Sequence, residues 1–570
     1  MNSRVLLTRS LEHRLLLAST WLKTCLSLHD ECLTHTDKDQ NSYAPTRLID
    51  VGPADGSQEP FLQTSTARVR DWVTLSHCWG SVQPLKTTKN SLSHHQNSLP
   101  YKSLPRLFQE ALETVRILGY QYLWIDSLCI IQDSGQDWQR EASRMGETYR
   151  HCVFMISADF CNNHTESFFS LAAEKDYVVQ GCHSPSKGFR DSIWTYYAGN
   201  EEARRLSRGI LQSRAWALQE AILSPRTLQW TQEQLVWDCR TTTLSEEIPC
   251  PSIHHNYLGI MVHETNLKAV CLSKESFQSR TKADELVTPR AQYDPLYLWY
   301  RIVGVYCQRH MSFSRDKFPA ISGIAKEVAR HTGFDYLAGI WAQDFHNGLM
   351  WATDGCEKRS EEYVAPTWSW ASTCNHRLHT AALVIPWNRD MFPVTPAAEV
   401  VDIDIKYAGL DTFSAVTSAV LRMKGRCMVL GDFDAGNIII GDTLDLDRIY
   451  DPSWGTSFLK SKKGQLAFLW LDCKPYTSED VVADLVTQGA ILLEVGSIGY
   501  RKLSGGGGKK IAEMNEADEP QAPVVQYVVA TFGLILKPTR NSSDEYERIG
   551  ITRITGDMHE GWESQLISII

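Results

Sequence analysis

Short apolar runs of strand type alternate with longer segments of helical periodicity between residues 71 and 235, and this alternation constrains the fold more than any other feature. We predict strands at 72–75, 122–125, 152–157 and 227–231, and helices at 104–118, 137–149 and 213–223. Strands that alternate with helices in this way are typical of parallel sheets with right-handed connections. The expected fold of this segment is α/β, with a doubly wound, mainly parallel sheet.

Residues that start and stop helices support these bounds. Gly119 directly follows the first predicted helix, where a residue that tolerates positive φ is favoured. Asp137 is expected to be the N-cap of the second helix. The third helix is stopped by Ser224 and Pro225, because proline cannot continue the hydrogen-bonding pattern.

The remaining chain divides by pattern into three further segments. Residues 1–70 contain an N-terminal helix and a loop, residues 236–375 have mostly helical periodicity, and residues 376–570 have the short alternating runs of a β-rich domain. Gly505–Gly508 is expected to be a flexible loop. With the α/β domain at 71–235, we predict four segments in all.

Composition and charge exclude several classes of protein. Hydrophobic residues make up 43% of the chain and charged residues 22%, which is ordinary for a globular protein. The formal net charge of -10 argues against a nucleic-acid partner. No apolar run approaches the roughly 18 residues of a membrane span, and Arg4, Arg9 and Arg14 interrupt any apolar stretch of a signal peptide. We therefore expect a cytoplasmic protein.

The histidines and cysteines show no familiar metal-binding pattern. The 15 cysteines are scattered, without a C-x-x-C pair or zinc-finger spacing, which favours a reducing compartment. The adjacent pairs His94–His95 and His254–His255 have no further ligand at a recognisable spacing. No metal site and no bound cofactor are expected.

Three segments of the α/β region carry a family resemblance. They are VTLSHCWG at 73–80, LWIDSLCIIQ at 123–132 and SRAWALQE at 213–220. In this order they resemble the motifs of the heterokaryon incompatibility (HET) domain, with Ala215 where that family usually has glycine. The resemblance implies a fungal protein of self/non-self recognition and regulated cell death.

A more distant resemblance concerns mechanism. The strand ending at Ser76 and the segment ending at Glu220 are similar to parts of Toll/interleukin receptor (TIR) domains, some of which cleave NAD. This resemblance implies a TIR-like fold, a catalytic role for Glu220, and NAD as a substrate rather than a cofactor.

The spacing of Trp216 and Glu220 suits a nucleotide. Residues four apart lie on one face of a helix, so an aromatic ring could stack on a base while a carboxylate reaches a sugar. A carboxylate also stabilises the oxocarbenium-like state of glycosidic cleavage. The alternative is structural, with the Trp216 ring in the core and Glu220 fixing its own helix.

Three polar residues follow predicted strands and are expected to bind substrate. Ser76, His77 and Asp126 would lie at the carboxyl edge of the sheet, where ligands bind in α/β folds. Asp126 suits ribose hydroxyls, but a cap for the next turn is an equal alternative. His77 with Cys78 or Cys129 could also form a nucleophilic pair, although buried cysteines are often simply apolar.

Two classes of function remain open. The first is an enzyme, an NAD glycohydrolase that kills the cell by consuming NAD. The second is a non-catalytic signalling module that assembles with an unidentified protein partner, or with copies of itself, to trigger death. A regulatory role unrelated to incompatibility between strains is a third. The first two differ in whether Glu220 and Asp126 face one open pocket.

Overall fold

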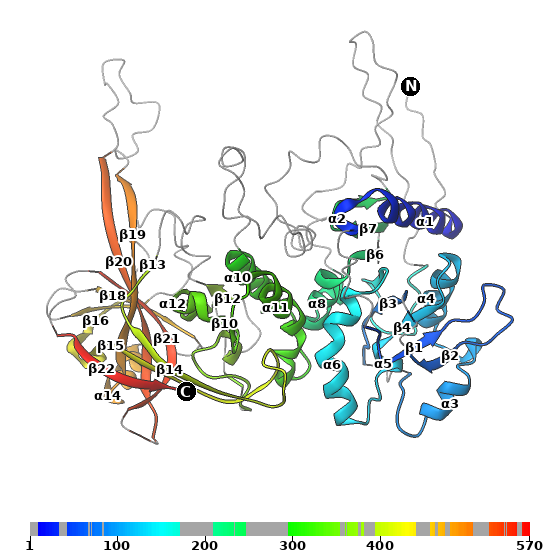
Figure 1. The fold of residues 1–570 in the computed structure, drawn as a ribbon. Coiled ribbons are helices and arrows are strands. Elements are labelled where there is room, and N and C mark those ends of the chain that lie inside the picture. The colour runs from blue at the N-terminus through cyan, green and yellow to red at the C-terminus, as the bar shows by residue number, and fades with distance from the viewer. Residues whose placement is uncertain are drawn as a thin grey trace, which may run out of the picture. The chain divides into compact units, whose positions relative to one another are not determined.

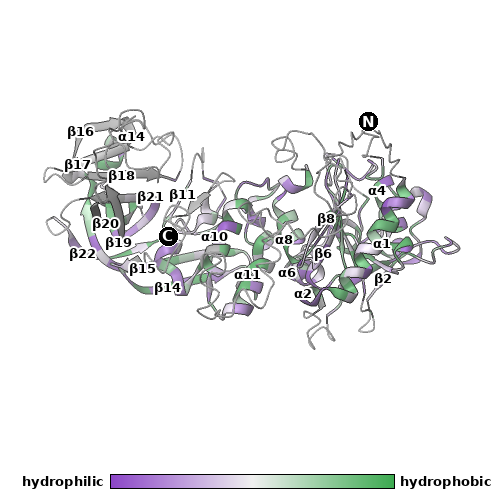
Figure 2. Ribbon diagram, turned by 90° about the horizontal axis from the view of Figure 1, so that it is seen from above, coloured by the Kyte–Doolittle hydropathy of each residue, from purple (hydrophilic) through white to green (hydrophobic). Residues whose placement is uncertain are grey.

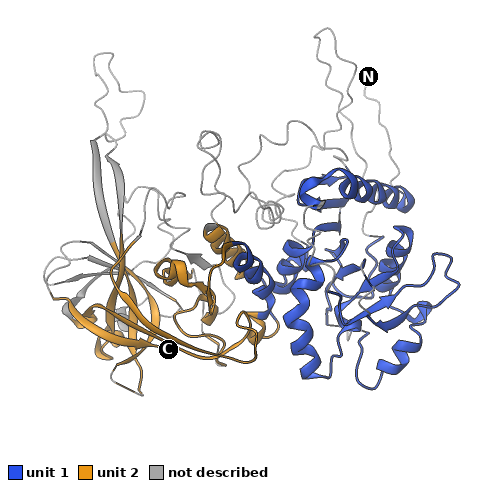
Figure 3. Cartoon of the chain, in the orientation of Figure 1, with its two compact units in different colours: residues 1–278, 309–311, 319–331 blue, residues 279–308, 312–318, 332–570 orange. Residues whose placement is uncertain are grey.

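The computed structural model describes a set of ranges within the 570-residue chain. These are 10–33, 43–65, 69, 71–81, 85–170, 209–232, 234–246, 295–353, 359–360, 362–373, 378–380, 394–440, 457–461, 466–472, 479–504, 524–540, 542, 544–555 and 561–570. Two compact units are present (Figure 3): unit 1 comprises 1–278, 309–311 and 319–331, and unit 2 comprises 279–308, 312–318 and 332–570.

Unit 1 is built on an eight-stranded sheet with the order β2-β1-β4-β3-β5-β6-β7-β8 (Figure 1). Its strands are β1 Arg47–Asp50, β2 Phe61–Thr64, β3 Val73–Ser76, β4 Tyr122–Trp124, β5 Met155–Ala158, β6 Arg226–Trp230, β7 Leu235–Cys239 and β8 Thr243–Ser245. The four central strands, β4, β3, β5 and β6, pair in parallel, as the strand–helix alternation predicts.

The outer strands, which lie almost entirely outside the predicted segment 71–235, add antiparallel pairs to this parallel centre. On one side β1 pairs antiparallel with both β2 and β4, and on the other β7 pairs antiparallel with β6 and β8. The sheet is therefore mixed. The turns after β6 and β7 are too short for the crossover that a parallel pair needs, so these strands can only form hairpins.

Helices cover both faces of the central strands. The helices of unit 1 are α1 Leu11–Leu28, α2 Asp30–Leu33, α3 Leu92–Asn97, α4 Arg106–Ile117, α5 Asp126–Cys129, α6 Gly135–Arg150, α8 Ala215–Leu223 and α11 Pro319–Thr332. Figure 1 shows α4 on one side of the strands, with α6 and α8 on the other. Figure 2 shows hydrophobic and hydrophilic residues alternating along α4. The buried residues of this helix include Leu107, Phe108, Leu112 and Val115.

The end of α4 is as predicted, whereas the N-cap of α6 is a different residue from the one predicted. Gly119, just after α4, has φ +85°, as expected for the residue that terminates a helix. The N-cap of α6 is Ser134 rather than the predicted Asp137, since the Ser134 Oγ accepts a 3.4 Å hydrogen bond from the Asp137 amide. The Asp137 carboxylate instead forms a buried ion pair with Arg47 of β1.

Two glycines bring α6 and α11 into close contact. A Cβ atom on Gly146 would lie 2.8 Å from the Cα of Gly323, and one on Gly323 would lie 2.8 Å from both Gln219 Oε1 and Leu223 Cδ1. The Gly323 amide donates a 2.6 Å hydrogen bond to Gln219 Oε1. The absence of side chains at both positions therefore lets α11 lie against α6 and α8.

Unit 2 begins with a helical and hairpin region. Its elements are α10 Pro295–Tyr306, β9 Tyr336–Leu337, β10 Ile340–Trp341, α12 Phe345–Leu349, β11 Trp351–Thr353 and β12 Leu378–Thr380. Strands β9 and β10 form one antiparallel pair, and β11 and β12 form another. The region thus adds two small β pairs to the helices that the sequence predicts there.

The rest of unit 2 is a ten-stranded sheet, which confirms the β-rich C-terminal region. Its elements are β13 Val394–Pro396, β14 Glu399–Tyr407, β15 Val416–Val429, β16 Phe433–Ile440, β17 Ser457–Ser461, β18 Leu466–Leu471, α14 Glu479–Thr487, β19 Ile491–Ser504, β20 Val524–Pro538, β21 Glu545–Thr555 and β22 Glu563–Ile569. The predicted loop Gly505–Gly508 lies outside the described residues, and the division into four segments stays a prediction.

Candidate functional site

The carboxyl ends of the central strands bring together residues that are far apart in the chain. Ser76 is the last residue of β3 and His77 follows it, while Asp126 begins α5 shortly after β4 ends. Glu220, on α8, reaches the same edge, where its Oε2 accepts a hydrogen bond from the Ser76 hydroxyl. Four of the five predicted site residues are therefore neighbours.

The Glu220 carboxyl group is buried in a polar environment. It accepts a hydrogen bond from Ser76 and lies near Tyr149 of α6, whose hydroxyl donates to the Leu75 carbonyl oxygen at 3.5 Å. The residue is only 6% exposed. Burial raises the pKa of Glu220 to about 7, although the hydrogen bond from Ser76 and the charge of Arg214 act in the opposite direction. The negative charge of Asp126 adds to the rise in this pKa. Burial therefore favours the protonated form of this carboxyl group.

The Asp126 carboxylate combines local capping with partial exposure. Its Oδ1 accepts a 2.7 Å hydrogen bond from the Ser127 amide, and its Oδ2 accepts a 2.8 Å hydrogen bond from Trp79 Nε1. The side chain is still 21% exposed. Asp126 thus holds the loop after β3 through Trp79, while part of its side chain is open to solvent.

His77 is neutral and almost fully enclosed. Its Nδ1 lies 3.9 Å from Asp126 Oδ1, and its ring meets Phe108 edge-on with 5.2 Å between centroids. Burial lowers the pKa of His77 to about 4 despite the nearby Asp126 charge. Within the described part of the chain, no group is hydrogen-bonded to its buried Nε2. A neutral imidazole with an unpaired nitrogen can donate to, or accept from, a ligand.

The neighbouring cysteines, Cys78 and Cys129, are buried thiols. Cys78 packs with Leu211 and Ala217, and burial raises its pKa. Burial also raises the pKa of Cys129 to about 12. A thiol is a nucleophile only as the thiolate, so both groups are held in their unreactive form. The interpretation as a Cys–His pair with His77 therefore loses support.

The fifth predicted residue, Trp216, is half-buried on α8 one helical turn before Glu220. Two contributors to the site were missed from the sequence, Tyr149 and Arg214. Arg214 donates from Nη1 to the His77 carbonyl oxygen, and Tyr149 contacts Glu220. Arg214 lies inside the third motif, which could have indicated its role, whereas Tyr149 looks like any apolar-face residue of its helix.

One known family matches the part of the chain that forms this site. Residues 72–220 match the family model for heterokaryon incompatibility protein (HET). The chain contains a HET domain. This domain runs from β3 to α8, so it includes all five predicted site residues, and it implies a role in heterokaryon incompatibility and cell death.

The other comparisons add no relative. Neither the curated proteins nor the solved structures gave a significant match to the chain. The resemblance to TIR domains is not shown by any comparison and stays a hypothesis. No helix among the described residues is long and apolar enough to cross a membrane.

Proposed function

We propose that this HET protein is a cell-death effector whose HET domain cleaves NAD at the bond between nicotinamide and ribose. One observation carries the proposal: the Glu220 carboxyl group, with a pKa raised to about 7, lies at the carboxyl edge of the parallel strands, where the charge of Asp126 adds to the rise. This edge is where α/β folds bind ligands, and shifted pKa values gather at functional sites.

The proposed chemistry assigns a role to each side chain. The ionised Glu220 stabilises the positive charge that develops on the ribose as neutral nicotinamide leaves with the bonding electron pair. Water then attacks the sugar carbon and loses a proton, which gives ADP-ribose. The exposed part of Asp126 would hold ribose hydroxyls, and Trp216 would stack on a flat ring. His77 Nε2 would supply a further hydrogen bond to the ligand, and the Ser76 hydroxyl would keep Glu220 in place.

A second candidate function is a non-catalytic signalling module. The observation that favours it is the 6% exposure of Glu220, whose hydrogen bond with Ser76 joins α8 to β3. In this function the carboxyl group holds the domain together, and the death signal passes by assembly with a protein partner or with a second copy of the chain.

Expression in cells separates the two functions. Under the enzymatic proposal, the wild-type chain depletes NAD and kills cells, while Glu220→Gln at equal soluble expression restores both viability and NAD. The loss of a charge-stabilising group is expected to lower turnover by about 10²–10³-fold. Glu113→Gln, on α4 at the other face of the sheet, is the matched control and should stay toxic. Cell death at normal NAD content, unchanged by Glu220→Gln, would instead support the assembly module.

A further inference from the structure

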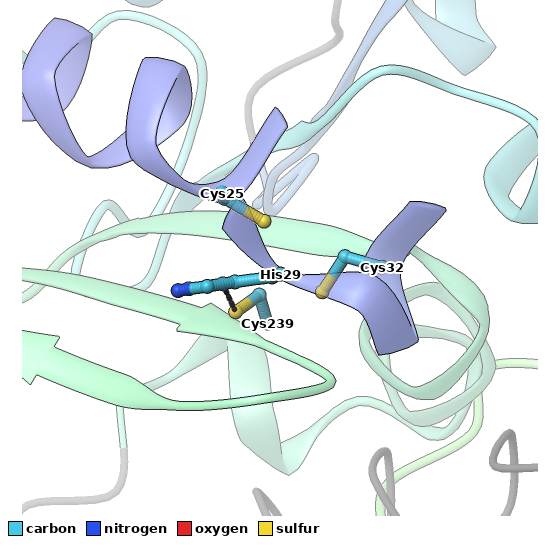
Figure 4. A group of neighbouring side chains, drawn as sticks. All are labelled: Cys25, His29, Cys32 and Cys239. Carbon is cyan, nitrogen blue, oxygen red and sulfur yellow. Dashed lines mark hydrogen bonds between the residues drawn. The ribbon is translucent and has the colours of Figure 1, made fainter. Parts of the chain in front are cut away.

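Three sulfur atoms and one imidazole converge at the edge of unit 1, away from the site described above. They belong to Cys25 near the end of α1, His29 just after it, Cys32 in α2 and Cys239 at the end of β7 (Figure 4). The four ligand atoms lie within 4.8 Å of one another, and His29 Nδ1 is 3.4 Å from Cys239 Sγ. All three cysteines are buried, and none forms a disulfide.

Local backbone geometry explains how three of the four meet. Cys25 lies near the end of α1 and Cys32 lies in α2, with His29 at the break between the two helices. The extended backbone of His29 (φ -99°, ψ 95°) separates α1 from α2 and turns the chain around the cluster. The Cys32 amide then donates a 2.9 Å hydrogen bond to the His29 carbonyl oxygen, which fixes this turn.

The fourth member comes from the hairpin between β7 and β8. The Cys239 amide donates a 3.0 Å hydrogen bond to the Thr242 carbonyl oxygen, which holds the tight turn in which Cys239 lies. Thr241, from the same turn, places its Oγ1 3.5 Å from Cys32 Sγ. Two segments that are distant in the sequence therefore present three thiols and an imidazole to one point. Soft ligands of this kind select thiophilic cations.

Buried positive charge surrounds the sulfur atoms. Arg226 of β6 donates from Nε to Cys25 Sγ at 3.1 Å and from Nη2 to the Cys32 carbonyl oxygen at 3.2 Å. Arg240, next to Cys239, is also buried, and its Nε and Nη1 have no hydrogen-bond partner among the described residues. Buried guanidinium groups require nearby negative charge. The charge of Glu327 acts on Arg240, and thiolates would add to it, whereas neutral thiols would not. Three thiolates and one imidazole around a divalent cation carry a net charge of -1.

We infer that Cys25, His29, Cys32 and Cys239 bind a divalent cation of the zinc class as a closed, four-coordinate structural site. Three thiolates with one imidazole are an established ligand set for structural zinc, and all four positions are filled by protein, which leaves none for a substrate. A disulfide would use only two of the three sulfur atoms and would give the imidazole no role.

The cation would fasten the N-terminal helices to the sheet. Helix α1 packs along β7, and Arg14 of α1 forms a 2.8 Å ion pair with Glu246 just after β8. The four ligands join the end of α1, and α2, to the end of β7. All four lie outside the matched residues 72–220. Binding would therefore extend the fold beyond the HET segment, with binding free energy that adds to folding free energy.

Metal analysis of the full chain tests the inference directly. The wild-type chain, purified under reducing conditions, incubated with Zn²⁺ and freed of excess ion, should hold about one zinc per chain. Cobalt substitution should give the visible absorption of a tetrahedral site together with a thiolate-to-cobalt charge-transfer band. Removal of the metal by a chelator should lower the melting temperature.

Variants locate the ion. Cys32→Ser and Cys239→Ser should each reduce the retained zinc at least tenfold, whereas Cys161→Ser, which removes a buried thiol elsewhere in unit 1, should retain it. The wild-type measurement decides the matter even if a variant fails to fold. A wild-type chain that retains no zinc, or a disulfide found between two of these cysteines in the isolated protein, would overturn the inference.

Discussion

The hydroxyl of Ser76, at the end of β3, donates a hydrogen bond to the carboxyl group of Glu220 on α8, and this single contact joins two HET motifs that are 144 residues apart. Burial raises the pKa of Glu220, and the bond from Ser76 works against that rise. The strand end therefore both positions the carboxyl group and limits how far its proton affinity can increase.

Removal of this donor should shift the pH dependence of the chemistry. In Ser76→Ala the ionised form of Glu220 loses a hydrogen bond, so its pKa should rise by about 1–2 units above the present value. Under the enzymatic proposal, NAD cleavage by the purified chain should then fall at neutral pH and recover at higher pH. Ser143→Ala, on the exposed side of α6, is the control. An unmoved midpoint would show that Ser76 does not govern the ionisation of Glu220.

The raised pKa of Glu220 also has a consequence for stability that requires no catalysis. Because the folded pKa, about 7, lies above the ordinary value of 4.5, the folded state holds the proton more tightly than the unfolded state. The stabilising effect is fully present below about pH 4.5 and is lost as the pH rises through 7. Glu220→Gln carries no titrating proton, so its stability lacks this dependence.

We therefore expect the free energy of unfolding of Glu220→Gln, taken relative to that of the wild type, to rise by about 2–3 kcal/mol when the pH increases from 5 to 8. The measurement is the free energy of unfolding of both chains in urea at the two pH values. Because the pKa of His77 is lowered to about 4, both chains lose the same stability as the pH falls below 6.5. The difference between their free energies of unfolding therefore reports on Glu220 alone. A difference that does not change with pH would mean that Glu220 is ionised throughout.

The central part of the fold could be predicted because its signals are local. Periodicity within a few turns defines β3, α4, β4, α6, β5, α8 and β6, and the alternation of these elements requires parallel pairing. The edge positions of Ser76, His77 and Asp126 follow from that pairing. The antiparallel placement of β1 between β2 and β4 could not be predicted, since the partner of a strand depends on tertiary packing rather than on its own residues.

The side-chain contacts of the site residues were harder to predict from the sequence than the strands and helices. Asp126 has two alternatives in the sequence, and the structure shows it accepting from the Ser127 amide and from Trp79, a contact that no spacing rule predicts. The cluster of Cys25, His29, Cys32 and Cys239 could not be predicted because its spacing is not that of a zinc finger. The spacing of the first three is visible in the sequence, but the fourth lies 210 residues from His29 and only the fold brings it near.

The close contact of α6, α8 and α11 predicts a large effect of a small substitution. Gly323→Val would place methyl groups against Gln219 and against the backbone of Gly146, where even a Cβ is too close at 2.8–2.9 Å. Overpacking of this kind costs about 1–3 kcal/mol, so the melting temperature should fall. Gly135→Val is the matched control, because a Cβ at the start of α6 meets nothing within 4 Å. Equal melting temperatures for the two variants would mean that α11 does not pack as described.

Unit 2 contains a guanidinium group with no exposure to solvent. Arg548 of β21 donates from Nη1 to the Leu349 carbonyl oxygen at 2.6 Å, and its Nη2 lies 3.2 Å from Asp472 Oδ1. The guanidinium carbon is 3.4 Å from the centre of the Trp351 ring. Burial lowers the pKa of Arg548 to about 10, so the group remains charged at neutral pH, where it depends on these partners.

Replacement of Arg548 should therefore destabilise unit 2 far more than loss of an arginine on its surface. Arg548→Met keeps much of the side-chain volume but leaves Asp472 with a buried charge that, among the described residues, only Arg359 still balances, at 3.1 Å. Breaking a buried pair in this way costs about 3–5 kcal/mol. In Arg422→Met, the control, the lost partner Asp402 is 54% exposed and the expected cost is about 0–1 kcal/mol. Urea unfolding followed by a probe in unit 2 measures both costs. Similarly small losses in the free energy of unfolding for the two variants would show that the buried pair of Arg548 and Asp472 does not stabilise unit 2.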